Sequence, residues 1–162
     1  MAYTDIRDLL VRPSWLTIVP GSHQCWQCRR RAKNQNGQAR QDARPYFCNR
    51  WCRFIYVSTL VKRHRVAVCP SCLRAPNLPH RPNCIVEICE KTNWRCALCG
   101  DPVDPSLQEP DPRRPTFDHV MPRASGGVKT NDNLRLTHAI CNAERRRLSD
   151  DAWRKKTGFS PL

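Results

Sequence analysis

The sequence has few residues that could build a large hydrophobic core, and it has no long apolar run. Of its 162 residues 40% are hydrophobic, but that share includes all eleven cysteines, and fourteen prolines interrupt the chain. No stretch approaches the roughly 20 apolar residues of a membrane-spanning helix. The opening MAYTDIRDLLVRPSW has no apolar stretch long enough for a signal peptide. We therefore expect small modules, which usually need a metal or disulfide staple.

Acidic residues are scarce relative to basic ones. The chain has 28 Lys and Arg against 14 Asp and Glu, a formal net charge of +14. This much positive charge on a small chain suits a polyanion, and the usual one is nucleic acid. A merely soluble basic protein is the alternative. Charge alone does not show which nucleic acid is bound, or whether it is altered.

Cysteine is abundant, and its spacing indicates zinc rather than disulfides. An odd count of eleven, without a secretion signal, argues against a disulfide framework. We therefore expect zinc sites in a protein of a reducing cytoplasm. The cysteines form four C-x2-C or C-x3-C pairs: Cys25/Cys28, Cys48/Cys52, Cys69/Cys72 and Cys96/Cys99.

The first two pairs predict one zinc site in an N-terminal module that spans residues 1–64. Cys25 and Cys28 would lie on a tight turn, and Cys48 and Cys52 on the first turn of a helix through RFIYVSTLVKRH. Residues 1–20 predict a short amphipathic helical turn and an extended piece. The intervening RRRAKNQNGQARQDAR is either a phosphate-contacting finger or a solvated basic loop.

Residues 65–84 predict a second, knuckle-like zinc segment. The spacing C-x2-C-x7-H-x3-C offers four tetrahedral ligands, namely Cys69, Cys72, His80 and Cys84. His80 lies between prolines and could be a surface residue, in which case Cys89 would take its place. The following CIVEICEKTNW predicts a helix with Ile85, Ile88 and Cys89 on one side. Cys89 is best explained as a small buried hydrophobe.

A third set of ligands is split between two distant elements. Cys96 and Cys99 form a knuckle in WRCALCGDPVDP, with Gly100 allowing the tight turn, and His138 and Cys141 begin a predicted helix. Together they predict a closed structural zinc site. The three sites use every cysteine except Cys89.

Asp118 and His119 lie between the two halves of this third site. TFDHVM predicts a strand, PRASGGVKTNDN a glycine-containing loop, LRLTH a second strand and AICNAERRRL a helix. A lone Asp-His pair at a strand end is usually structural or solvated, but this pair shares its segment with Asn131 and Asn133, and with Asn142 beside the zinc ligands. The sequence here resembles the HNH endonuclease family, in its zinc-stapled phage and bacterial type. The resemblance covers about residues 85–148 and rests on WRCALCG, DHVMPRASGG and NLRLTHAICN.

The resemblance implies a small zinc-stabilised α+β fold. Its C-terminal ββα-metal (His-Me finger) nuclease domain would span residues 85–150, preceded by the two zinc-binding modules. Residues 151–162 would be a C-terminal tail, since SDDAWRKKTGFSPL reads as a frayed helical end. The protein would act in the cytoplasm of a bacterium or a bacterial host.

The family's site residues fall on particular positions here. His119 would be the general base, since its ordinary pKa of about 6.5 lets it accept a proton near neutrality. Asp118 would hold a catalytic Mg²⁺ or Mn²⁺. The last motif position is Asn142, an amide that suits these ions better than Zn²⁺. Asn133, with Asn131 as the runner-up, would fix the loop and so aim the histidine.

These residues lead to three hypotheses. The first is a metal-dependent endonuclease that nicks or cuts duplex DNA from the minor groove, with a dimer if both strands are cut. The second is a zinc-finger-like nucleic-acid-binding protein with a catalytically silent HNH scaffold. The third, compatible with either, is a module of a larger phage or restriction complex. Phosphate contacts are expected from Arg123, Lys129, Arg145, Arg146 and Arg147, although the last three could form a solvated helix face.

Overall fold

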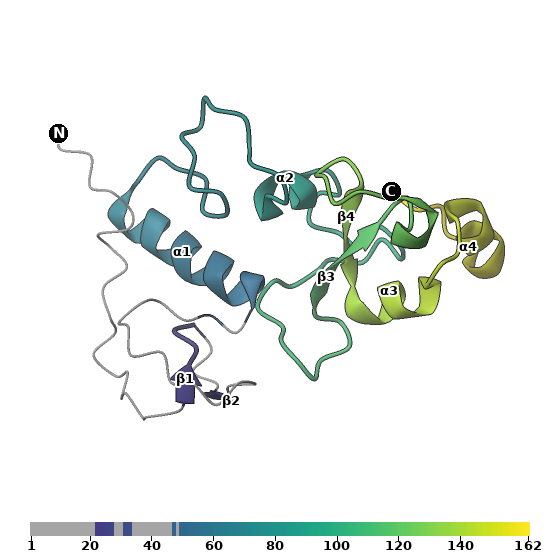
Figure 1. Cartoon of the computed structure of the whole chain (residues 1–162), viewed down its shortest axis with the longest axis horizontal. Helices are drawn as coiled ribbons and strands as arrows, with labels where there is room; N and C mark the ends of the chain where they lie inside the picture. Colours follow the sequence, from purple (N-terminus) through teal and green to yellow (C-terminus); the bar gives the residue numbers. More distant parts are fainter. Residues whose placement is uncertain (1–21, 28–30, 34–46, 48) are drawn as a thin grey trace. The chain divides into compact units, whose positions relative to one another are not determined.

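The computed structural model describes residues 22–27, 31–33, 47 and 49–162 (Figure 1). The opening predicted at residues 1–20 lies outside these residues, as do Cys28 and Cys48 of the first predicted zinc site. The chain divides into two units, residues 1–75 and residues 76–162. The described strands pair into two-stranded antiparallel sheets beside helices, so the protein is a small α+β protein.

The first unit contains β1 (Ser22–Gln24), β2 (Arg31–Lys33) and α1 (Arg50–His64). β1 and β2 pair antiparallel, so part of the predicted basic loop is a strand. The predicted helix through RFIYVSTLVKRH is confirmed as α1. It begins at Asn49, whose side chain accepts a hydrogen bond from the Cys52 amide at 2.9 Å. Its basic last turn is favourable at a helix C-terminus.

In the second unit, α2 (Ile85–Glu90) buries Ile85, Ile88 and Cys89, as the sequence predicts. Such burial of apolar side chains is the main stabilising contribution to a small module. α2 contacts strand β4 (Leu134–His138), every residue of which is buried. Part of the core of this unit therefore lies between α2 and β4.

The predicted strand, loop, strand and helix are present in this order (Figure 1). β3 (Pro115–His119) pairs antiparallel with β4, with Pro115 opposite His138 and His119 opposite Leu134. The short 3₁₀ helix η1 (Arg123–Ser125) lies in the connection. α3 (Ala139–Arg145) follows β4 directly and contacts both strands. This arrangement brings the end of β3 close to α3.

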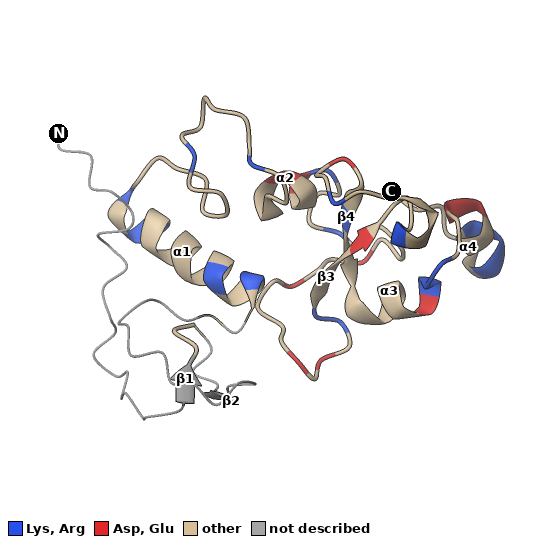
Figure 2. Ribbon diagram, viewed as in Figure 1, with Lys and Arg blue, Asp and Glu red and all other residues tan. Residues whose placement is uncertain are grey.

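The C-terminal segment is more ordered than the frayed end that the sequence predicts. α4 (Asp150–Thr157) begins at Ser149, whose hydroxyl accepts from the Ala152 amide at 3.2 Å. Trp153 is buried, and its indole Nε1 donates to the Leu98 carbonyl at 3.0 Å. The helix has acidic residues in its first turn and basic residues in its last turn (Figure 2). Charges in these positions interact favourably with the helix dipole.

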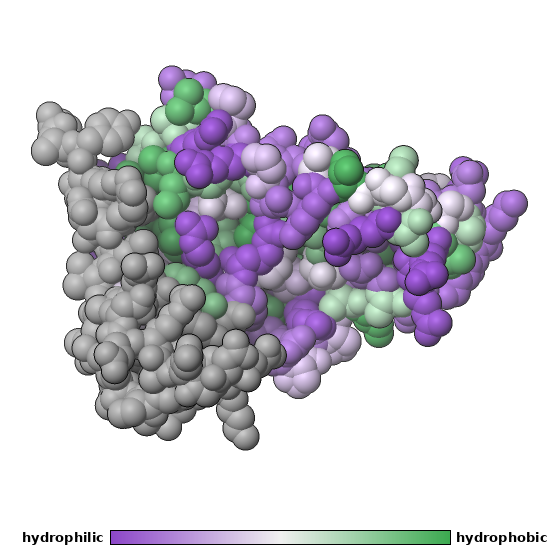
Figure 3. Space-filling view, in the orientation of Figure 1, coloured by the Kyte–Doolittle hydropathy of each residue, from purple (hydrophilic) through white to green (hydrophobic). Residues whose placement is uncertain are grey.

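The described surface is hydrophilic over most of the face seen in Figure 3, with hydrophobic residues in separate areas. Within the described part of the chain, no helix combines the length and apolar character that spanning a membrane requires.

Candidate functional site

The third predicted ligand set forms a tight cluster in the second unit. The ligand atoms of Cys96, Cys99, His138 and Cys141 all lie within 4.8 Å of one another. The knuckle is closed by hydrogen bonds from the Cys96 amide to the Asp101 carbonyl and from the Gly100 amide to the Cys96 carbonyl, both at 2.8 Å. Gly100 takes a left-handed φ of 79°, as this turn requires.

The donors of this cluster are oriented toward a common centre. His138 Nδ1 lies 3.4 Å from Cys99 Sγ and 3.9 Å from Cys141 Sγ. Its other ring nitrogen, Nε2, lies 3.1 Å from the Pro102 carbonyl, to which it can donate. This outer hydrogen bond leaves the Nδ1 lone pair for a metal, as is usual for metal-binding histidines.

The electrostatics of the cluster favour a bound cation. Burial raises the pKa of the Cys141 thiol, and the neighbouring Cys96 and Cys99 sulfurs raise it further. Burial likewise raises the pKa of Cys99. Three thiolates this close repel one another unless a cation lies between them, so the four donors could hold zinc.

The second predicted set also forms a cluster. The ligand atoms of Cys69, Cys72, His80 and Cys84 lie within 4.8 Å of one another, and they too could hold zinc. His80 Nδ1 is 3.3 Å from Cys84 Sγ. Cys89 is not part of this cluster and is buried in α2. The structure thus brings His80, rather than Cys89, to the three cysteines.

The first predicted set cannot be assembled from the described residues alone. Cys25 and Cys52 are both fully buried. Their predicted co-ligands, Cys28 and Cys48, lie outside the described residues. A zinc site in this module therefore stays a prediction.

Asp118, His119 and Asn142 line one pocket of about 300 Å³ at the end of β3. Asp118 and His119 are the last two residues of β3, and Asn142 lies on α3. The Asn142 side-chain nitrogen donates to the Phe117 carbonyl at 3.2 Å, which holds α3 against the strand. Its amide oxygen is left to accept or to ligate.

His119 has the properties of a proton acceptor. Its Nε2 is buried and has no hydrogen-bond partner among the described residues. Burial lowers the pKa of His119, and the charges of Arg123 and Lys129 lower it further, whereas Asp118 opposes them. The pKa therefore lies below its usual value near 6.5, and the imidazole is neutral at pH 7.

Asp118 is held by two buried arginines. Its side chain is 4% exposed, and its two oxygens accept from Arg135 Nε at 3.1 Å and from Arg145 Nη1 at 2.9 Å. Both guanidinium groups also bind Asp150, at 2.6 Å and 3.1 Å. The two acids and two arginines form a ring of alternating charge, which compensates the burial of each member.

Arg145 is not the exposed phosphate contact that the sequence predicts. It is fully buried, and it also donates to the carbonyls of His119 and Val120, each at 3.0 Å. It therefore holds the end of β3 and is not available to a phosphate. Arg146 and Arg147, in contrast, are exposed and line the pocket together with Arg123.

Asn133 clasps the loop after His119. Its side-chain oxygen accepts from the Met121 amide at 2.8 Å, and its nitrogen donates to the carbonyls of Met121 at 3.2 Å and Val128 at 2.8 Å. Asn131, the runner-up for this position, instead accepts from the Cys84 amide at 3.2 Å and donates to the Arg81 carbonyl at 3.1 Å. The two asparagines thus fix different segments.

Two residues of the charge ring, Arg135 and Asp150, carry no sequence signal for the site. Arg135 lies in the predicted strand LRLTH, where its partner could not be known. Asp150 lies in the segment predicted to be a frayed end. Only the packing of α4 brings Asp150 to Arg135 and Arg145.

Comparison with known proteins supports the resemblance. Residues 96–147 match the family model described as HNH endonuclease. No curated protein and no solved structure matches the chain. The matched residues include the cysteine and histidine cluster around Cys96 and the pocket around His119, whereas α4 lies beyond them.

Proposed function

We propose, from the match of residues 96–147 to the family model described as HNH endonuclease, that the protein is a metal-dependent endonuclease that hydrolyses phosphodiester bonds of DNA. The observation that carries this proposal is the pocket that joins Asp118, His119 and Asn142. A protein that only bound nucleic acid would need the zinc clusters but not these three side chains together.

His119 is the general base of the proposed reaction. It accepts a proton from water while the water oxygen bonds to phosphorus, and the bond from phosphorus to the leaving sugar oxygen breaks. A neutral imidazole is required for this step, and burial and Arg123 keep the pKa of His119 low. Asn133 is a positioning residue, because its clasp fixes the loop that follows His119.

The chemistry of the pocket suits a hard divalent ion. Asp118 and Asn142 offer oxygen donors, as Mg²⁺ or Mn²⁺ prefers. Two of the roughly four lone-pair sites of the Asp118 carboxylate accept from arginines, which leaves two. Such an ion would stabilise the charge that develops on the scissile phosphate. Because the two arginines offset the charge of Asp118, we expect weak ion binding until phosphate oxygens complete the ligand set.

The exposed cations hold the substrate. Arg123, Lys129, Arg146 and Arg147 would contact DNA phosphates, whereas Arg145 positions Asp118 and His119. β3, β4 and α3 would act as a ββα-metal unit in the minor groove. The N-terminal zinc modules, residues 1–64 and 65–84, would hold the backbone, and the nuclease domain would span residues 85–150. We place the protein in the cytoplasm, acting alone, as a dimer or in a larger phage or restriction complex.

One observation favours a second function. Both oxygens of Asp118 are already engaged by Arg135 and Arg145. If the charge of these arginines prevents an ion from binding to Asp118 even when DNA is present, the protein would be a zinc-dependent DNA-binding protein with a silent HNH scaffold.

Cleavage of supercoiled plasmid separates the two functions. Zinc-loaded protein is incubated with plasmid, with or without added Mg²⁺ or Mn²⁺, beside His119→Ala and the matched control His64→Ala. His64 is an exposed histidine at the end of α1. An endonuclease gives relaxed or linear product that needs the added ion, disappears in His119→Ala and remains in His64→Ala. Absence of cleavage by the unchanged protein, with salt-sensitive DNA binding intact, would establish the binding protein instead.

A further inference from the structure

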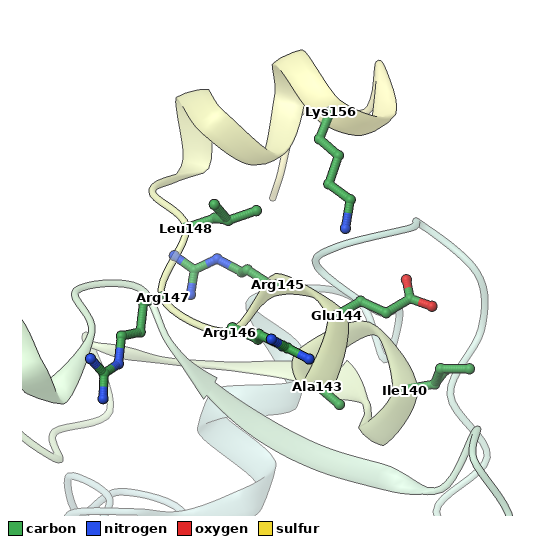
Figure 4. A pocket seen from close by; sticks show the side chains of 8 residues that line it. All are labelled: Ile140, Ala143, Glu144, Arg145, Arg146, Arg147, Leu148 and Lys156. Carbon is green, nitrogen blue, oxygen red and sulfur yellow. The ribbon is translucent and has the colours of Figure 1, made fainter.

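A second pocket, of about 820 Å³, lies between α3 and α4 (Figure 4). Its lining includes Ile140, Glu144, Arg146, Arg147, Leu148 and Lys156. We propose that this pocket binds the phosphodiester backbone of DNA beside the scissile phosphate, with Lys156 as a phosphate contact. The inference rests on the proposed function and adds to it a substrate contact from a helix beyond the matched domain.

The charge of the pocket suits a phosphate. Arg146, Arg147 and Lys156 are exposed, and none of them forms an ion pair with a described residue. Glu144 is the one carboxylate among the residues that line the pocket. Arg145 adds little free charge, because Asp118 and Asp150 bind its guanidinium group. The three unpaired cations therefore outweigh the single acid.

This pocket shares lining residues with the pocket that contains His119. Arg146 and Arg147 line both pockets. The chain turns at Arg146, whose φ of 51° and ψ of −110° are rare for a side chain other than glycine. In Figure 4 Arg146 and Lys156 extend into the pocket, while Arg147 points away from Lys156. A DNA strand could thus contact Arg147 and Arg146 in turn and then reach Lys156.

Lys156 is held in place by packing. Its Nζ lies over the Trp153 ring, 5.5 Å from the ring centroid. Trp153 is buried and donates to the Leu98 carbonyl, within the knuckle between Cys96 and Cys99. Trp153 therefore links Lys156 to the segment between Cys96 and Cys99. Lys156 and His119 belong to the same unit of the chain.

The remaining lining residues also suit a nucleic acid strand. Ile140 is 42% exposed, and Leu148, on the opposite side of the pocket in Figure 4, is half-buried. Apolar side chains between cations can pack against deoxyribose while the cations bind phosphates. A polymer with alternating sugar and phosphate groups matches both features.

The test compares Lys156→Ala with Lys155→Ala, since Lys155 is an exposed lysine of α4 that does not line the pocket. Binding of zinc-loaded protein to a fluorescent DNA duplex is measured by anisotropy without added divalent ion, between 50 and 200 mM salt. Loss of one phosphate contact lowers the slope of log affinity against log salt by about 0.9. Between 50 and 200 mM salt, the affinity for DNA should therefore decrease for both proteins. The factor of decrease should be about 3.5 times smaller for Lys156→Ala than for the unchanged protein.

Lys155→Ala and the charge-preserving Lys156→Arg should keep the slope of the unchanged protein. In plasmid cleavage, Lys156→Ala should raise KM and leave kcat unchanged, whereas His119→Ala abolishes kcat. A lower slope for Lys156→Ala without any cleavage by the unchanged protein would support the phosphate contact while the proposed nuclease function fails. Equal slopes for the two alanine variants, with cleavage intact, would overturn the contact alone.

Discussion

At the scale of single residues, the pKa of His119 is the property most open to measurement. Burial lowers it first, and the Arg123 charge lowers it next. Removal of that charge makes protonation of the imidazole easier. In Arg123→Ala the acidic limb of the pH profile of kcat/KM should therefore move to higher pH. The profile is measured at a fixed, saturating concentration of the divalent ion.

Lys129→Ala is the matched control for this shift. Lys129 also lowers the pKa of His119, but its contribution is the smallest of the four causes. The acidic limb of the pH profile of Lys129→Ala should therefore also move to higher pH, but by less than that of Arg123→Ala. A shift to lower pH in Arg123→Ala, or no shift at all, would show that another group limits the rate.

The loop after His119 leaves no room for a side chain at Gly127. A Cβ at this position would lie 1.9 Å from the Met121 carbonyl oxygen and 2.9 Å from the Asn133 side-chain nitrogen. Gly127→Ala must therefore move the backbone that follows His119. Because a displacement of about 1 Å can cost about 100-fold in rate, we expect kcat for plasmid cleavage to fall by roughly that factor.

Gly126→Ala provides the comparison for Gly127→Ala. Gly126 has a left-handed φ of 86°, but no atom lies within 4 Å of an added Cβ. Alanine there should cost about 1 kcal/mol of stability, through backbone strain, and leave kcat near its original value. Equal kcat values for the two variants would contradict the role of the Asn133 clasp.

At the scale of elements, α4 is joined to the site by Asp150. Its carboxylate binds two buried guanidinium groups, those of Arg135 and Arg145. Asp150→Asn removes the charge and should lower the free energy of unfolding by about 1.5–3 kcal/mol, as for hydrogen bonds to charged groups. Asp151→Asn should cost less than about 1 kcal/mol, because Asp151 and its partner Arg154 are both exposed. Urea unfolding of the two variants tests this difference.

The elements differ in how far the sequence could predict them. β3, β4 and α3 were predictable, since apolar positions and the predicted zinc ligands Cys96 and His138 mark their places locally. α4 was not, because its only buried residue is Trp153, whose partner is the Leu98 carbonyl far away in the chain. The ring around Asp118 could not be predicted for the same reason. Its pairs form only when α4 packs against the domain.

At the scale of the whole molecule, we expect stability to depend on metal binding by the two cysteine and histidine clusters. The second unit has a small apolar core, and four of its buried or half-buried donors surround one centre near Cys96. Since binding of structural zinc supplies much of the folding free energy of such domains, a zinc chelator should lower Tm by more than about 10 °C. Added Zn²⁺ should restore Tm, and Mg²⁺ should not. An unchanged Tm after zinc removal would contradict this dependence.

Zinc content can be assigned to the clusters one by one. Cys96→Ser removes a ligand from the cluster with Cys99, His138 and Cys141, and should lower the bound zinc by about one ion per chain. Cys89→Ala is the matched control, because Cys89 is buried in α2 and belongs to neither cluster. It should destabilise the fold and keep the zinc content. Elemental analysis of the purified variants decides the matter, since equal zinc in both would show that the cluster near Cys96 holds no ion.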